Sequence, residues 1–331
     1  MESIQVMRAI AAIAVVFVHI PVLAKNGTWG VDLFFVISGF IMCHVTEQSS
    51  DHFFIKRLIR VVPLYWAGTI GLFVLACVAP NLLQNTTANL IHLFKSLAFI
   101  PFRKGVAVQP VMFLGWTLNY EILFYCLFAI SIKLSHRYRA VICSGFILAL
   151  VVYGEMAQPD TIPIRFWTSS ITIEFILGMV CYYAYRATGI SHTREIFNPS
   201  RIGWYLAGAM ALACLPLATY LAEYNRVLKY GVAATLSLYF VLCGLSGIRL
   251  PGSMVLLGDA SYSLYMFHPY IIQTLYRGFD VFLGAGWFRY FMAGTTVMVC
   301  CIMSVLSYRY FEKPVTDFLR SHLTVAPDSG R

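Results

Sequence analysis

The sequence predicts an all-α, polytopic integral membrane protein, a bundle of about ten transmembrane helices. Of its 331 residues, 59% are hydrophobic and only 12% are charged, a balance that water-soluble domains of this length do not show. Apolar runs of roughly 17 to 20 residues recur, and each can cross a hydrocarbon core of about 30 Å as a helix. The runs lack the alternating pattern of a membrane β-barrel, and a helix satisfies its own backbone hydrogen bonds in lipid.

The first apolar stretch, Ile4 to Leu23, is predicted to be a retained helix rather than a cleaved signal peptide. Arg8 lies inside the run, and no small-residue cleavage site follows it. The ten predicted helices, in chain order, are 4–23, 30–47, 61–79, 113–132, 138–155, 167–186, 202–221, 227–246, 253–276 and 286–308. Residues 1–314 are expected to form one transmembrane domain, and residues 315–331 a short polar cytoplasmic tail.

The distribution of basic residues predicts the orientation in the membrane. If the amino terminus is cytoplasmic, 15 of the 24 Lys and Arg residues lie on the cytoplasmic side, so the positive-inside rule favours two cytoplasmic termini. The net charge of +9 does not indicate nucleic-acid binding, because the basic residues are dispersed over short loops. The nine cysteines show no metal-ligand spacing, so we expect no metal.

Several ionisable residues lie within the predicted helices, where each costs a few kcal/mol unless it lines a cavity or a site. They are Arg8, His19, Asp32, Glu121, Glu174, Asp259 and His268. Asp32 and Asp259 can instead be boundary residues whose side chains reach the interface. The other members are harder to explain in that way, so the set predicts a polar site inside the bundle.

Depth divides the polar residues into two layers. With the amino terminus inside, the two histidines and the carboxylates Asp32, Glu121 and Glu174 fall in the outer half. Arg8, Arg309 and the 57–60 cluster fall at the inner end. Arg8 and His19 are eleven residues apart, which leaves them within roughly 20° of one helix face and about 16 Å apart in height. A ligand with a phosphorylated head and a long arm fits this spacing, and coenzyme A has that shape.

These residues fall in motifs that resemble the membrane acyltransferase-three superfamily over nearly the whole chain. The most characteristic string is GVDLFFVISGF at 30–40, which follows the arginine and histidine of the first helix. The remaining motifs are RLIR at 57–60, WTLNYE at 116–121, LGDASYSLY at 257–265 with His268 and Pro269, and YFEKP at 310–314.

The resemblance implies an O-acyltransferase of the bacterial inner membrane. Such an enzyme moves an acyl group, usually acetyl, from cytoplasmic acyl-coenzyme A to a hydroxyl of an exopolysaccharide, O-antigen or lipid-linked glycan, without a metal. Some relatives carry a periplasmic esterase-like domain, whereas this chain stops soon after Pro314. We therefore expect the membrane domain, or a polysaccharide assembly protein as partner, to handle the acceptor.

Within this family His19 is the candidate general base, because a sugar hydroxyl is a poor nucleophile and imidazole titrates near neutral pH. A structural histidine and a transient acyl-histidine are the alternatives. Glu121 can fix the tautomer of His19, hold the acceptor hydroxyl, or only form a hydrogen bond between helices.

The three arginines Arg8, Arg57 and Arg60 are predicted to bind the phosphates of the coenzyme, since guanidinium matches phosphate oxygens in pairs. Alternatively, Arg57 and Arg60 only anchor the chain on the cytoplasmic side of the membrane under the positive-inside rule. The predicted acceptor-binding residues are Asp32, Trp116, Glu174 and His268.

Two other functions compete with catalysis. A transporter or flippase can use intramembrane carboxylates and histidines as a proton relay, and a membrane scaffold for polysaccharide assembly needs only packing. The arginine-to-histidine face and the lack of inverted repeats favour the enzyme.

Overall fold

A computed structural model describes residues 1–23, 27–83, 88–190, 202–218, 225–278 and 286–324. Within these ranges the chain is helical apart from one antiparallel pair of two-residue strands. The chain is therefore an all-α protein, as its sequence predicts. It divides into two compact units, residues 1–44 with 173–308 and residues 45–172 with 309–331.

Seven helical segments of the described residues are long and apolar enough to cross a membrane. They are Glu2–His19, Phe53–Val78, Phe113–Leu134, Arg139–Ala157, Ile162–Ala187, Val227–Leu245 and Gly286–Leu323. Two shorter apolar helices, Trp29–Val45 and Ile202–Ala218, bring the total to nine of the ten predicted ranges. The polytopic membrane bundle is thus confirmed.

The remaining predicted helix, 253–276, is wrong as a single element. It consists of α11, Gly252–Asp259, and α12, Ser261–Gly278, separated at Ala260, where ψ is 1°. The string Gly258-Asp259 has low helix propensity. In addition, α11 passes so close to α1 that a Cβ on Gly258 would lie 2.0 Å from the Gln5 carbonyl oxygen. The close crossing fixes α11 in a separate direction from α12.

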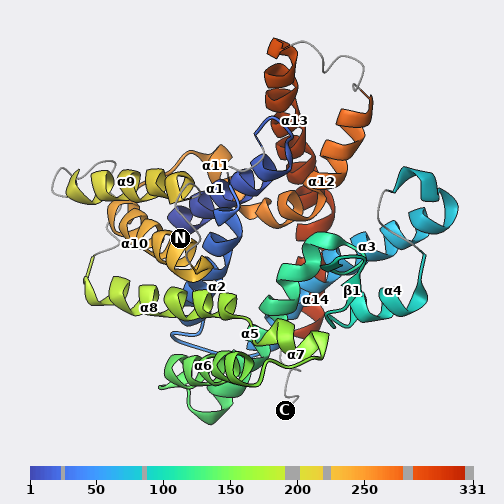
Figure 1. Cartoon of the computed structure of the whole chain (residues 1–331). Helices are drawn as coiled ribbons and strands as arrows, with labels where there is room; N and C mark the ends of the chain where they lie inside the picture. Colours follow the sequence, from blue (N-terminus) through green and yellow to red (C-terminus); the bar gives the residue numbers. More distant parts are fainter. Residues whose placement is uncertain (24–26, 84–87, 191–201, 219–224, 279–285, 325–331) are drawn as a thin grey trace, which may run out of the picture. The chain divides into compact units, whose positions relative to one another are not determined.

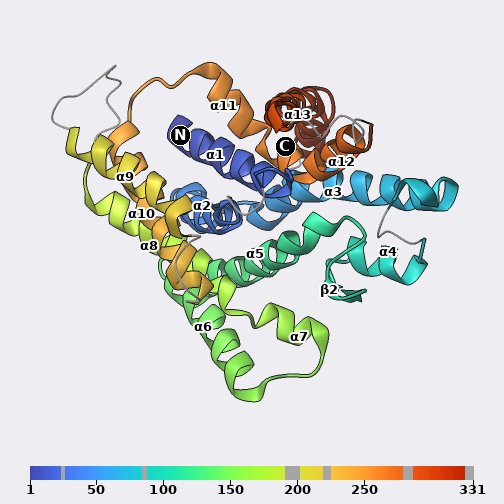
Figure 2. The ribbon, with the colours of Figure 1, turned by 45° about the horizontal axis from the view of Figure 1, so that its top comes forward.

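The first unit contains the amino-terminal helices and most of the carboxy-terminal ones. Its elements are α1 (Glu2–His19), α2 (Trp29–Val45), α8 (Ile173–Ala187), α9 (Ile202–Ala218), the π-helix η5 (Val227–Gly231), α10 (Val232–Leu245), α11, α12 and α13 (Gly286–Ser307). Helix α1 contacts α10, α11, α12 and α13, so it is the central helix of this unit (Figures 1 and 2). Its alanines at 9, 11, 12 and 14 are buried and allow this close packing.

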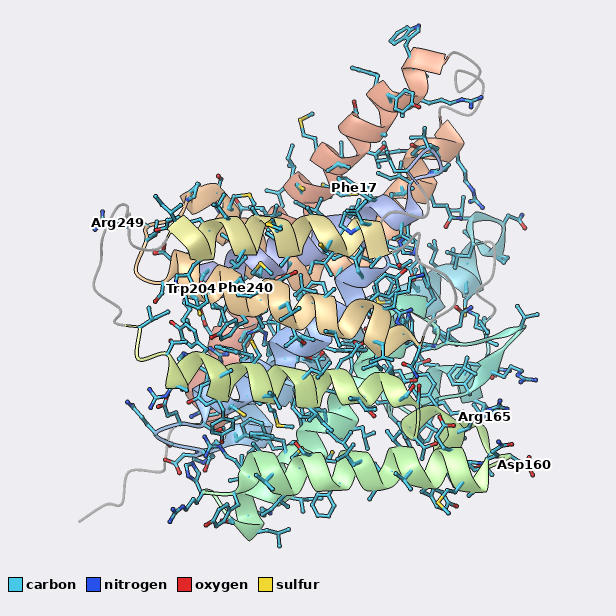
Figure 3. The ribbon with its side chains drawn as sticks, turned by 60° about the vertical axis from the view of Figure 1, so that its left-hand side comes forward. Phe17, Asp160, Arg165, Trp204, Phe240 and Arg249 are labelled. Carbon is cyan, nitrogen blue, oxygen red and sulfur yellow. The ribbon has the colours of Figure 1, made fainter. Side chains whose placement is uncertain are left out.

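Glycines let the helices of the first unit approach closely at a second crossing. A Cβ on Gly39 of α2 would lie 2.1 Å from the Phe175 carbonyl oxygen of α8, and one on Gly178 of α8 would lie 2.0 Å from the Val36 carbonyl oxygen of α2. Helices α9 and α10 also run side by side, with the Trp204 and Phe240 rings 6.0 Å apart (Figure 3). These contacts position α2 and α8, which carry two of the predicted polar residues.

The second unit is built around α3 (Phe53–Val78) and α5 (Trp116–Leu134). Its other elements are η1 (Pro80–Leu82), α4 (Leu90–Leu97), β1 (Arg103–Lys104), β2 (Ala107–Val108), η2 (Phe113–Gly115), α6 (Arg139–Ala157), α7 (Ile162–Trp167), η3 (Ser170–Thr172) and α14 (Lys313–Leu323). The π-helix η7 (Tyr308–Glu312) leads from α13 into α14. Helix α3 contacts α4, α5 and α14, and α5 contacts α6.

Helix α3 begins at Phe53, eight residues before the predicted start at Val61. The segment was expected outside the helix because its apolar run starts only at 61. Lysine and arginine are nevertheless good helix formers, and Lys56, Arg57 and Arg60 occupy the first turns of α3. Both predicted phosphate-binding residues of this segment therefore stand on one rigid helix.

Candidate active site

Two histidines meet in the first unit. His19 is the last residue of α1, and His268 is the eighth residue of α12. His268 Nε2 is 3.1 Å from His19 Nδ1, and the two ring centroids are 4.8 Å apart in an edge-to-face arrangement. His268 is fully buried and His19 half-buried. Two residues 249 positions apart in sequence thus form one imidazole pair.

The neighbouring carbonyl groups assign the tautomers of the pair. His268 Nδ1 is 3.0 Å from the Leu264 carbonyl oxygen. This carbonyl can only accept, so His268 carries its proton on Nδ1 and its lone pair on Nε2. The lone pair then accepts from His19 Nδ1–H, which also points to the Val15 carbonyl oxygen at 2.9 Å. In this arrangement the lone pair of His19 lies on Nε2.

Pro269 follows His268 and contributes to its position. Proline has no backbone N–H, so Pro269 makes no helical hydrogen bond to the Tyr265 carbonyl four residues earlier. That carbonyl interacts with the His268 ring instead. Helix α12 continues through Pro269, and the proline therefore supplies an additional acceptor beside the histidine pair.

A second polar group of the first unit joins α2, α8 and the segment before α10. Arg226 donates to both oxygens of Asp32, with Nε–Oδ1 2.9 Å and Nη2–Oδ2 2.8 Å. The Glu174 carboxyl lies beside Asp32 and interacts with both partners. Asp32 and Glu174 are fully buried, and neither Glu174 oxygen has a hydrogen-bond partner among the described residues. This group, Asp32, Glu174 and Arg226, is called the carboxylate cluster below.

Arg8, the other predicted polar residue of α1, is 6% exposed. Its Nη1 donates to Gln5 Oε1 at 3.1 Å, one turn earlier.

The second unit gathers positive charge around the start of α3. Arg57 interacts electrostatically with Tyr125 and Glu121 of α5, with Arg60, and with Arg320 of α14. Three guanidinium groups and one carboxylate therefore lie near one another at the start of α3. Arg57 Nε is buried and has no hydrogen-bond partner among the described residues. This excess of positive charge is suited to an anion such as a phosphate.

Glu121 accepts a short hydrogen bond from the Tyr125 hydroxyl, one turn later on α5. Trp116 begins the same helix, half-buried, with its ring centroid 6.0 Å from that of Tyr120. Tyr120 in turn stacks on Phe166 of α7 at 4.1 Å. Trp116 and Tyr120 therefore lie on one face of α5, and Glu121 lies about 100° around the helix from Tyr120.

The fold brings together His19 with His268 and Asp32 with Glu174, which were predicted in one layer, and Arg57 with Arg60. Glu121 was predicted in the layer of the histidines, but it interacts with Arg57 in the second unit. Three partners were not predicted: Arg226, Arg320 and Tyr125. Arg226 was treated as a loop charge between two helices, and Arg320 as part of the tail. The one available signal was the spacing of Glu121 and Tyr125, which are neighbours on one helix face.

Comparison with known proteins is consistent with these motifs. A family model described as an acyltransferase domain matches residues 1–306. The exopolysaccharide production protein ExoZ of Rhizobium meliloti (strain 1021) is 34% identical over 316 residues, which cover 92% of this chain and 94% of ExoZ.

The O-acetyltransferase OatA of Staphylococcus aureus (strain NCTC 8325) is 24% identical, covering 93% of this chain and 56% of OatA. The peptidoglycan O-acetyltransferase OatA of Listeria monocytogenes is 23% identical, covering 95% of this chain and 55% of that protein. This chain therefore spans little more than half the length of the OatA proteins. No solved structure matches it. The family match and the relative at 34% identity lead to the conclusion that this chain belongs to the membrane acyltransferase-three family.

Proposed function

We propose that this protein is an O-acetyltransferase that moves an acetyl group from acetyl-coenzyme A to a saccharide hydroxyl. The observation that carries the proposal is the pair of imidazoles, because its hydrogen bonds leave a lone pair on His19 Nε2. The relatives support the proposal, because ExoZ is an exopolysaccharide production protein and OatA is an O-acetyltransferase.

In the proposed reaction, His19 Nε2 takes the proton of the acceptor hydroxyl as its oxygen attacks the thioester carbonyl carbon. The resulting imidazolium donates its Nδ1–H to His268 Nε2, which stabilises the positive charge. The carbon–sulfur bond then breaks, and the leaving thiolate receives the proton from His19. General base catalysis of this kind contributes about 10²- to 10⁴-fold to a rate.

His268 acquires a different role from the one predicted from sequence. We assign it as a positioning residue that holds the His19 tautomer, the task predicted for Glu121. Glu121 is then available to hold Arg57 through their electrostatic interaction. The other predicted role of Glu121, holding the acceptor hydroxyl, stays a prediction.

For the donor, we propose that Arg57 and Arg60 bind coenzyme phosphates, joined by Arg320 of α14. Arg8 of α1, in the first unit, stays a separate prediction as a phosphate-binding residue of the coenzyme. For the acceptor, the proposed contact within the first unit is the carboxylate cluster, since sugar hydroxyls donate hydrogen bonds to carboxylates. Trp116, in the second unit, stays a separate prediction as an acceptor-binding residue. The protein is proposed to lie in the bacterial inner membrane with both termini cytoplasmic. Polysaccharide assembly proteins are its proposed partners.

The test measures donor binding and transfer separately, with the protein reconstituted in lipid nanodiscs. A saturating donor at about 100 times its Kd stabilises the protein by about 2.7 kcal/mol. We expect acetyl-coenzyme A to raise the melting temperature of wild type and of His19→Ala, but not of Arg57→Ala or Arg8→Ala. Transfer of labelled acetyl to membrane glycans should be lost in His19→Ala.

If acetyl-coenzyme A does not raise the melting temperature of wild type, it is not the donor. The transporter and scaffold alternatives would then gain support. Transfer by His19→Ala at a rate near that of wild type would exclude a general base at this position.

A further inference from the structure

A pocket of about 250 Å³ lies in the first unit where α1 ends. Its described lining residues are Pro21 and Val22, which follow α1, Tyr276 of α12 and Arg289 of α13. Helix α1 contacts both α12 and α13 (Figures 1 and 2). The Leu23 N–H donates to the Ile20 carbonyl oxygen at 2.9 Å, so a turn directly after α1 supplies one wall of the pocket.

The pocket adjoins the histidine pair. Pro21 is two residues after His19, and two residues of extended chain span at most about 7 Å. Val22 and Tyr276 pack against a buried apolar cluster. Four members of this cluster lie within four residues of one of the two histidines: Val16, Ile20, Leu264 and Ile272. A group bound in the pocket therefore lies beside the proposed base.

The polar groups of the pocket suit an anion. Arg289 supplies a guanidinium, which can only donate hydrogen bonds. The Tyr276 hydroxyl is buried and has no hydrogen-bond partner among the described residues, a state that costs free energy unless a ligand fills it. None of the described residues that line the pocket is Asp or Glu. Two donors and one positive charge match the oxygens of a carboxylate or a phosphate.

We propose that this pocket binds a carboxylate or phosphate group of the acceptor saccharide. This inference rests on the proposed function and adds to it the charge of the acceptor. A neutral sugar is a poorer occupant, because it gains no Coulomb attraction to the Arg289 guanidinium. The phosphate of a membrane lipid has similar chemistry, but an acceptor must lie beside His19 for its hydroxyl to reach the base.

The test measures binding of two fluorescently labelled oligosaccharides to the full-length protein in phosphatidylcholine nanodiscs. One is an oligogalacturonate, and the other is the neutral oligogalactose made by reducing its carboxyl groups. We expect the acidic oligosaccharide to bind about tenfold more tightly to wild type than the neutral one. Arg289→Gln should raise the Kd of the acidic oligosaccharide about tenfold and leave that of the neutral one unchanged, and Tyr276→Phe should raise it about fivefold.

Arg277→Gln is the matched control, because it removes the same charge from an exposed residue of α12 that does not line the pocket. It should leave the Kd of the acidic oligosaccharide nearly unchanged, since exposed charges outside the pocket are screened by salt. Equal Kd values of the two oligosaccharides for wild type would overturn the inference. An equal rise in Kd in Arg277→Gln and Arg289→Gln would show only dispersed charge attraction and would overturn it too.

Nanodiscs with added phosphatidylglycerol separate the acceptor from membrane lipid. The surface charge of this lipid weakens binding of the acidic oligosaccharide to every variant alike. The ratio of the Kd of Arg289→Gln to that of wild type should therefore stay at about ten. A ratio that falls to about one would show that lipid head groups fill the pocket, and the acceptor would lose its place there.

A transfer assay separates this inference from the proposed function. It follows labelled acetyl from acetyl-coenzyme A to membrane glycans of the producing bacterium. Arg289→Gln should raise the KM for these glycans and leave kcat unchanged. Transfer by Arg289→Gln with an unchanged KM supports the reaction and refutes the pocket. Binding of the acidic oligosaccharide that depends on Arg289, without any transfer by wild type, refutes the reaction and retains the anion pocket.

Discussion

Replacing His268 with alanine tests whether the second imidazole acts through the first. In the proposed reaction, His268 Nε2 accepts a hydrogen bond of 3.1 Å from a positively charged His19. A hydrogen bond to a charged group contributes about 1.5 to 3 kcal/mol, which corresponds to roughly 10- to 150-fold in kcat. We expect His268→Ala to lower kcat by this factor and to leave the KM for acetyl-coenzyme A unchanged.

The assay follows acetyl transfer to membrane glycans at varied donor and acceptor concentrations. His268 is fully buried, so alanine also leaves a cavity, and thermal unfolding is measured in parallel. His268→Gln keeps most of the volume and an acceptor oxygen, and it should recover part of kcat. His322→Ala, at an exposed histidine of α14, is the control and should behave as wild type.

Two results would refute this reasoning. A folded His268→Ala variant with kcat within about twofold of wild type would show that the hydrogen bond does not support the reaction. A rise in the KM for the acceptor alone, with kcat preserved, would instead support the role predicted from sequence, in which His268 contacts the acceptor.

Three further predictions concern other parts of the fold. Arg320→Ala should raise the Kd for acetyl-coenzyme A about tenfold, because one charge-assisted hydrogen bond is lost; calorimetry giving an unchanged Kd would remove Arg320 from the donor site. Gly39→Val should lower the melting temperature, since a Cβ at this position would lie 2.1 Å from the Phe175 carbonyl oxygen. Gly145→Ala should leave the melting temperature unchanged, because the space around Gly145 is open. Equal melting temperatures of the two variants would contradict this prediction. Asp32→Asn should destabilise the protein by about 1.5 to 3 kcal/mol, because a charge-assisted hydrogen bond to Arg226 is lost. The loss stays below that of a fully buried pair because the Arg226 side chain is 40% exposed and retains access to water. An unchanged unfolding temperature would show that the pair does not stabilise the fold.

The sequence was sufficient to predict the class of fold and most of the spans, because lipid imposes long apolar helices. It also predicted that ionisable residues such as His19 and Glu174 form sites, since isolated charges in hydrocarbon are costly. It did not predict which residues pair. Arg226 and Asp32 are 194 residues apart, and no periodicity along one helix relates them.

Local breaks in the helices were missed for a related reason. The division at Ala260 follows from the close crossing of Gly258 over α1, a contact between distant parts of the chain. The short helix α4 was missed because its 8 residues are too few for a membrane span. It is held instead by hydrogen bonds from α3, where the Tyr65 hydroxyl donates to the Ser96 carbonyl at 3.1 Å.

The histidine pair has a consequence for the order of biosynthesis. His268 is made 249 residues after His19, which at about 5 to 20 residues per second takes roughly 12 to 50 s. During that time α1 and α2 are already synthesised, while the helices that bury their polar side chains are not. Asp32 therefore has no Arg226 partner until the segment before α10 has been made, and a chain that stops before residue 268 has no imidazole pair. Assembly of the histidine pair is thus coupled to synthesis of the chain through α12.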